Sequence, residues 1–114
     1  MDIQRKELSG ATVVTISQLS ITYTDLEKLQ SELYAIIDGG ALRLVLDLSS
    51  VTTMDSFGVG VLMDAFRRMS RKGGVMKLAA VTARVRSALA ITKVDSVIEV
   101  HDTVDAACAS FGSE

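Results

Sequence analysis

The sequence contains no proline and no tryptophan, and it has only one cysteine and one histidine among its 114 residues. A single cysteine cannot form a disulfide framework, and one cysteine with one histidine cannot supply the several His/Cys ligands of a usual metal site. We therefore expect no disulfide, no metal and no other cofactor. Because proline-, glycine- and serine-rich stretches are also absent, no segment is a candidate linker.

Aromatic residues are scarce as well, at 4% of the chain, and 12 Lys and Arg nearly balance 14 Asp and Glu. Few rings are available to stack on bases or sugars, and a net charge of -2 offers no cationic excess for phosphates. Both observations argue against a nucleic-acid partner. The apolar runs are far shorter than the roughly 18 residues of a membrane span, and the first residues lack a signal-peptide core. We expect a cytoplasmic protein without a membrane span.

Hydrophobic residues nevertheless make up 48% of the chain, and they recur in alternating strand and helix patterns. Short apolar or β-rich runs predict strands at 12–16, 42–48, 75–81 and 97–100, with a further strand around 3–8. Helical spacing predicts helices at 25–38, 56–72, a short stretch from 82, and 103–111. The alternation predicts a single α/β domain over residues 1–114, with a mixed, mostly parallel sheet of four to five strands and about four helices.

The two longer helices have further local signals. Thr24 or Asp25 is expected to cap the start of the first, and Gly39-Gly40 to end it. The helix at 56–72 has Phe57, Val61, Leu62, Ala65, Phe66 and Met69 at helical spacing, and its inward stripe is expected to contain Phe57, Val61, Leu62 and Ala65. Val59 and Met63 fall on a different flank of that helix. Residues 49–53, which precede the helix, are predicted to form a polar turn.

Asp55 and Ser56 follow the strand predicted at 42–48 and open the next helix. Functional loops in open α/β sheets gather at the carboxyl ends of strands. Two interpretations are open, and the first is that both residues only cap the helix, a common arrangement. The second is that Ser56 is reversibly phosphorylated, because a phosphate at a helix N-terminus meets free N–H groups and the positive end of the dipole.

Gly58 and Gly60 each cost about 1 kcal/mol of helix stability relative to alanine. Glycine is tolerated in a helix where another backbone or a partner must approach closely. The two glycines therefore have two equally weighted interpretations. Either the helix packs tightly on its own sheet, or its start is a protein-docking surface beside a modifiable serine.

The most specific pattern in the chain lies at 44–62. It consists of Leu44-Val45-Leu46-Asp47-Leu48-Ser49-Ser50-Val51, followed by Met54-Asp55-Ser56-Phe57-Gly58-Val59-Gly60-Val61-Leu62. This pattern resembles the signature of STAS domains and is most similar to bacterial anti-sigma factor antagonists. In its order of elements the resemblance extends over about 12–111. Phe57 stands where antagonists commonly have Ser or Thr and where stressosome-type members also carry Phe, and the family's frequent Gly-x-Leu-Asp stretch is absent at 18–22.

The resemblance implies a regulator of transcription, not an enzyme, that acts by partner switching. Ser56 would be phosphorylated by an anti-sigma factor that is also a serine kinase of the histidine-kinase-like ATPase fold, and a PP2C-type phosphatase would remove the phosphate. The unphosphorylated protein would bind the kinase and the phosphorylated protein would be released. The implied partner-binding residues are Asp55, Phe57, Gly58, Val59, Gly60 and Met63. The alternative is a STAS scaffold or regulatory subunit, stressosome-like or transporter-associated, without a sigma-factor output.

Three further residues are expected to be structural. Asp47 is expected to support its loop by binding backbone amides, His101 to lie on the surface or cap a helix, and Cys108 to be a small core residue. The residue types of a hydrolytic triad are present in Ser56, His101 and Asp55. We do not expect a triad, because no Gly-x-Ser-x-Gly elbow is present. The chain also lacks a P-loop and a Gly-x-Gly-x-x-Gly pattern.

Overall fold

A five-stranded mixed sheet is the centre of the computed structural model, which describes residues 1–111. Its strands, in spatial order, are β1 (Asp2–Leu8), β2 (Ala11–Ser17), β4 (Arg43–Asp47), β6 (Val75–Ala79) and β7 (Val100–His101). β1 pairs antiparallel with β2, and the other neighbours pair in parallel. The β1–β2 hairpin turns at Ser9 and Gly10, which both have positive φ. The predicted mixed, mostly parallel sheet is confirmed.

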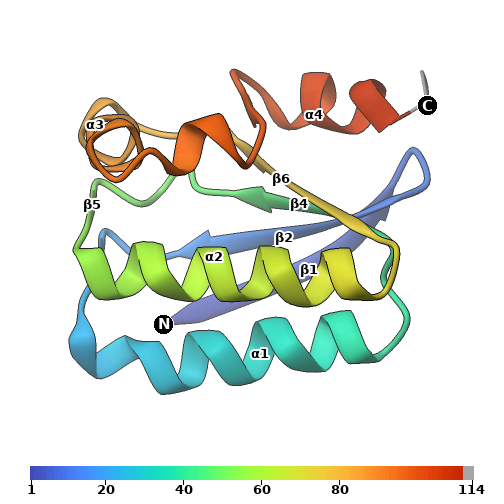
Figure 1. Cartoon of the computed structure of the whole chain (residues 1–114), viewed down its shortest axis with the longest axis horizontal. Helices are drawn as coiled ribbons and strands as arrows, with labels where there is room; N and C mark the ends of the chain where they lie inside the picture. The colour runs from blue at the N-terminus through green and yellow to red at the C-terminus, as the bar shows by residue number, and fades with distance from the viewer. Residues whose placement is uncertain (112–114) are drawn as a thin grey trace.

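Two layers of helices cover this sheet. The helices are α1 (Leu26–Asp38), α2 (Ser56–Arg71), α3 (Ala83–Ile91) and α4 (Val104–Phe111). Figure 1 shows α1 and α2 side by side along one face, with α4 on the opposite face. The predicted alternation of strands and helices is therefore confirmed.

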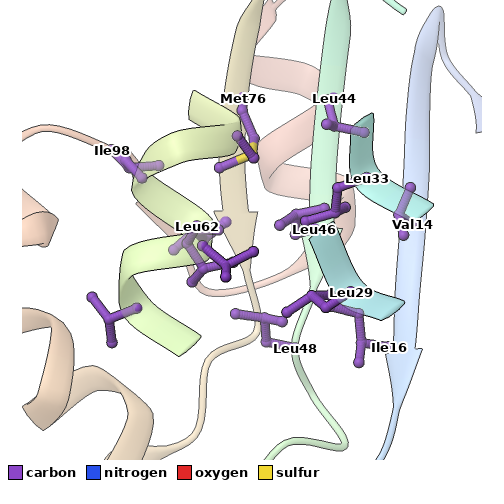
Figure 2. Close-up of a cluster of buried hydrophobic side chains, with 14 of the residues drawn as sticks. Val14, Ile16, Leu29, Leu33, Leu44, Leu46, Leu48, Leu62, Met76 and Ile98 are labelled. Atoms are coloured by element: carbon purple, nitrogen blue, oxygen red, sulfur yellow. The ribbon is translucent and has the colours of Figure 1, made fainter. Parts of the chain in front are cut away.

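The core explains why the central strands are almost continuously apolar. Leu44, Val45 and Leu46 of β4 are all fully buried, because successive side chains point to opposite, covered faces. Leu44 and Leu46 face α1 and α2 in the larger cluster (Figure 2), whereas Val45 joins the smaller cluster with Phe111 of α4. Each fully buried leucine contributes roughly 1.5–3 kcal/mol to the burial free energy.

A second, two-stranded sheet was not predicted. β3 (Ser20–Ile21) pairs in parallel with β5 (Thr53–Met54), and β5 overlaps the end of the turn predicted at 49–53. Met54 and Ile21 are both buried. The pairing joins segments 33 residues apart, so no local pattern signals it.

One helix cap and one strand boundary also differ from the predictions. Asp25 occupies the N-cap position of α1, but its carboxylate accepts a hydrogen bond from the Thr22 amide at 2.9 Å and makes no cap to α1. The last strand is only Val100–His101, because the short 3-10 helix η2 (Val94–Ser96) carries the chain to an exposed Val97. The strand predicted at 97–100 therefore begins three residues later.

Candidate functional site

Asp55 and Ser56 have different roles at the start of α2. Asp55 has extended backbone angles, and its Oδ1 accepts a hydrogen bond from the Gly58 amide at 3.0 Å. It is therefore the N-cap, and Ser56 is the first helical residue. The Ser56 side chain is exposed and takes no part in the cap. Capping thus accounts for Asp55 but leaves the Ser56 hydroxyl available.

The loop that leads to Asp55 is held by hydrogen bonds to a distant segment. The Leu19 carbonyl accepts from the Thr52 amide at 2.7 Å, the Thr53 amide at 3.1 Å and the Thr52 hydroxyl at 2.8 Å. The Thr53 hydroxyl also donates to Ser20 Oγ at 2.7 Å. These bonds and the β3–β5 pairing place residues 17–25 beside residues 48–60. We call these two segments together the Ser56 edge.

Two more side chains, Thr82 and Asp47, make hydrogen bonds that hold the loop of the Ser56 edge. The Thr82 hydroxyl donates to the Val51 carbonyl at 2.7 Å and so ties the start of α3 to the loop. Asp47 accepts from the Ser49 amide at 3.0 Å and from the Thr15 hydroxyl at 3.2 Å. The predicted loop-supporting role of Asp47 is confirmed.

Large apolar side chains are exposed on the Ser56 edge. Leu19 and Tyr23 are each 69% exposed, and Phe57 is 57% exposed. The rings of Tyr23 and Phe57 meet edge to face, with centroids 5.4 Å apart. The prediction that Phe57 points inward is wrong, because Gly58 occupies the inward position of the first turn, against Met54. Leu19 and Tyr23 were missed, since a contact between rings 34 residues apart leaves no local signal.

The structure separates the remaining residues predicted for the docking surface. Gly58 and Val59 are buried, with Val59 only 3% exposed, so the prediction that Val59 lies on a free flank is wrong. A Cβ on Gly58 would come within 2.6 Å of Met54 Cγ, so this glycine is required by internal packing. Gly60 is exposed and a Cβ there would meet nothing within 4 Å, while Met63 is half-buried. Internal packing therefore explains Gly58 but not Gly60.

The Ser56 edge has an unusual charge composition. Its two segments contain Asp25 and Asp55 and no lysine or arginine. The pKa of Asp25 is lowered, chiefly by the hydrogen bond from the Thr22 amide and next by one from the Gln18 side chain. A phosphate on Ser56 would consequently find no cation within these segments.

The interactions of His101 and Cys108 do not involve Ser56. His101 Nε2 lies 3.0 Å from Glu99 Oε1, and this hydrogen bond is the main cause of the lowered pKa of Glu99. Cys108 is a buried residue of α4 in the smaller core cluster, as predicted, and burial raises the pKa of its thiol. Within residues 1–111, no three or more His, Cys, Asp or Glu side chains are grouped to hold a metal ion. None of the described helices is long and apolar enough to cross a membrane.

Sequence comparisons identify one family over nearly the whole chain. A family model for the STAS domain matches residues 2–107. A Thermotoga neapolitana protein, whose name assigns it provisionally as an anti-sigma factor antagonist homologue, is 32% identical over 71 residues. The match covers 62% of this chain and 63% of that relative, so it spans less than two thirds of the relative's length.

Solved structures show the same fold at lower identity. The crystal structure of an anti-sigma factor antagonist from Mycobacterium paratuberculosis superimposes with a TM-score of 0.86 at 22% identity, covering 96% of this chain and 92% of the other. The phosphorylated form of the Bacillus cell fate determinant SpoIIAA gives a TM-score of 0.72 at 15% identity, covering 96% and 99%. At these sequence identities, both similarities show a shared fold.

Proposed function

Because this chain belongs to the STAS domain family, we propose that it is an anti-sigma factor antagonist that acts by partner switching through Ser56. Its partner in this proposal is an anti-sigma factor serine kinase of the histidine-kinase-like ATPase fold. The unphosphorylated chain binds the kinase, phosphorylation of Ser56 releases it, and a PP2C-type phosphatase restores the hydroxyl. The chain supplies a surface and an acceptor but no catalytic group. The names of the Thermotoga and Mycobacterium relatives support this class of function.

One observation carries the proposal: Ser56 is exposed at the first helical position while Asp55 alone makes the cap. The hydroxyl can therefore attack the γ-phosphate of ATP without disturbing a structural hydrogen bond. The Ser56 Oγ–P bond forms, the bond between the β- and γ-phosphates breaks, and the hydroxyl proton leaves. The phosphorylated form of SpoIIAA, which shares this fold, is consistent with such a modification.

The effect of the phosphate follows from the charge of the Ser56 edge. It adds roughly -1.5 to -2 charge at neutral pH to segments that contain two aspartates and no cation. Beside it lie the exposed rings of Phe57 and Tyr23, which suit an apolar contact with the partner. Burying a dianion in such a contact without a matched Arg or Lys is costly. Phosphorylation therefore weakens docking without changing the fold.

The direct test is to incubate the chain with an anti-sigma factor serine kinase and ATP, then locate the phosphate by mass spectrometry. We expect one phosphoryl group on Ser56 and none in Ser56→Ala. Ser49→Ala is the matched control, because Ser49 is another exposed serine of the Ser56 edge. It should be phosphorylated like the parent chain.

Binding measurements extend this test. We expect Ser56→Asp to weaken kinase binding about tenfold or more, whereas Ser49→Asp leaves it nearly unchanged. A phosphate on another residue, or none, contradicts the proposal. A large self-assembly that is insensitive to Ser56→Asp in size-exclusion chromatography would instead support the scaffold alternative.

A further inference from the structure

β1 forms one edge of the five-stranded sheet. It pairs with β2 on one side, and no strand of residues 1–111 pairs with its other side (Figure 1). Of its seven residues, Ile3 and Leu8 are half-buried and the other five are exposed. An uncovered edge of this length presents a row of backbone donors and acceptors with which another strand can pair. β1 therefore offers a site for strand addition.

The β1–β2 hairpin decides which backbone groups of β1 point away from the sheet. Its two-residue turn closes on the paired residues Leu8 and Ala11. Such a turn begins with a hydrogen-bonded pair, and hydrogen-bonded and non-hydrogen-bonded pairs then alternate along an antiparallel ladder. The even-numbered residues of β1 therefore direct their amides and carbonyls toward β2. The same groups of Ile3, Arg5 and Glu7 point outward, where a second strand can reach them.

The charges along β1 favour one register for pairing with a second copy of the same strand. When a twofold axis relates two identical antiparallel strands, one residue lies opposite its own copy. With Gln4 at that position, each Asp2 lies opposite the Lys6 of the other copy. Each Ile3 then lies opposite an Arg5, which matches the outward-pointing backbone groups. Centring the pair on Arg5 or Lys6 instead sets two like charges opposite each other, which is destabilising.

Asp2 and Lys6 are available for these ion pairs. Both are exposed, and their side chains lie on the same face of β1 because they are four residues apart. Within residues 1–111, neither has an oppositely charged group within 4.0 Å. On the other face, Arg5 keeps Glu7 of its own strand at 3.7 Å, and its aliphatic stem can cover the half-buried Ile3 of the other copy.

We propose that two copies of this chain pair through β1, antiparallel and with the two Gln4 residues opposite each other, so that their sheets become one continuous sheet. Ile3 and Arg5 exchange backbone hydrogen bonds across the interface. The opposite edge of the sheet, β7, has only two residues, so assembly ends at a closed dimer. This interface does not depend on the function proposed for Ser56.

The direct test is sedimentation equilibrium of the chain over a wide range of concentrations. We expect a reversible equilibrium between monomer and dimer. Lys6→Asp and Asp2→Lys should each weaken dimerisation about tenfold or more, because each sets like charges opposite one another. Lys93→Asp is the matched control, since it reverses the charge of an exposed lysine before η2, and it should dimerise like the parent chain. A parent chain that stays monomeric at every concentration leaves the edge to a segment of another protein and overturns the proposal.

Charge exchange tests the register. Mixing the Asp2→Lys variant with the Lys6→Asp variant should restore dimers, because one copy then has cations at both positions and the other has acids at both. The double variant Asp2→Lys/Lys6→Asp should dimerise like the parent chain. Dimers that the single changes leave unaffected, or that neither the mixture nor the double variant restores, overturn the Gln4-centred interface.

Amide hydrogen exchange provides a readout that does not depend on the variants. Exchange at Ile3 and Arg5 should slow as the concentration of the parent chain rises, because their amides become bonded across the interface. The Gln4 amide, which points toward β2, should exchange at nearly the same rate in monomer and dimer. Dimerisation without slower exchange at Ile3 and Arg5 would place the interface elsewhere and contradict the proposal.

Discussion

The two ends of the sheet are held together by different interactions. At the Ser56 edge, hydroxyl and backbone hydrogen bonds fix the loops, and exposed rings lie beside a free serine. At the opposite end, charged groups predominate: Arg68 makes a two-point pair with Asp38 at 2.7 and 2.9 Å, and Arg5 and Arg43 line a pocket. The net charge of -2 therefore conceals an uneven distribution: the two segments of the Ser56 edge contain no lysine or arginine, whereas the opposite end is cation-rich.

This separation determines how far a new charge on Ser56 is compensated. Arg71 ends α2, 15 residues beyond Ser56, or about 22 Å along the helix. That distance is more than twice the Debye length of about 8 Å at physiological ionic strength. Arg71 is therefore too far away to neutralise a phosphate on Ser56, whereas α3, which contacts β5 and α2, carries Arg84 and Arg86.

The largest expected effect distinguishes the buried from the exposed side chains of the Ser56 edge. Val59→Ala should lower the free energy of unfolding by about 2 kcal/mol, because it removes buried methyl groups. Phe57→Ala should lower it by less than about 1 kcal/mol, since only the contact with Tyr23 is lost. Urea denaturation measures both values.

Kinase binding should rank the same two variants in the opposite order, with the larger loss in Phe57→Ala. On the proposed function, Phe57→Ala weakens binding about tenfold or more, and folded Val59→Ala binds nearly as the parent chain. If Phe57→Ala binds the kinase as well as the parent chain, the aromatic pair is not part of the docking surface.

The two glycines of α2 provide a smaller comparison. Gly60→Ala should raise the free energy of unfolding by about 1 kcal/mol, because a Cβ meets nothing and alanine favours the helix. Gly58→Ala should lower it by about 1 kcal/mol or more, because its Cβ collides with Met54. If the partner approaches α2 closely, Gly60→Ala also weakens kinase binding despite its greater stability. Equal stability of the two variants would contradict the packing described for Gly58.

The smallest expected effect concerns the ion pair at the cation-rich end. The pKa of Asp38 lies below its ordinary 3.8, chiefly because of the hydrogen bonds from Arg68. A lowered folded-state pKa contributes stability that is present above 3.8 and is lost as the pH falls through the folded-state value. Urea midpoints measured across this range should fall less steeply in Asp38→Asn. Arg68→Gln should reduce the slope in the same way, and a slope unchanged in both variants would contradict this account.

Much of the fold could be predicted because its signals are local. The continuous apolar run of β4 and the helical spacing of α2 are visible in single windows, and both elements lie within a residue of their predicted bounds. The Asp55-Ser56 pair was likewise recognised as a helix start. The β3–β5 pairing and the Tyr23–Phe57 contact were not predicted, because each joins segments more than 30 residues apart.

By itself, the sequence determined the order of the elements, the STAS signature at 44–62 and the serine that opens α2. Only the tertiary structure decided which neighbours of Ser56 are exposed, that Gly58 and Gly60 differ, and that Arg68 pairs with Asp38. The physical reason is the range of the interactions. Periodicity and capping act within a few residues, whereas burial and charge pairing depend on which distant segments fold against each other.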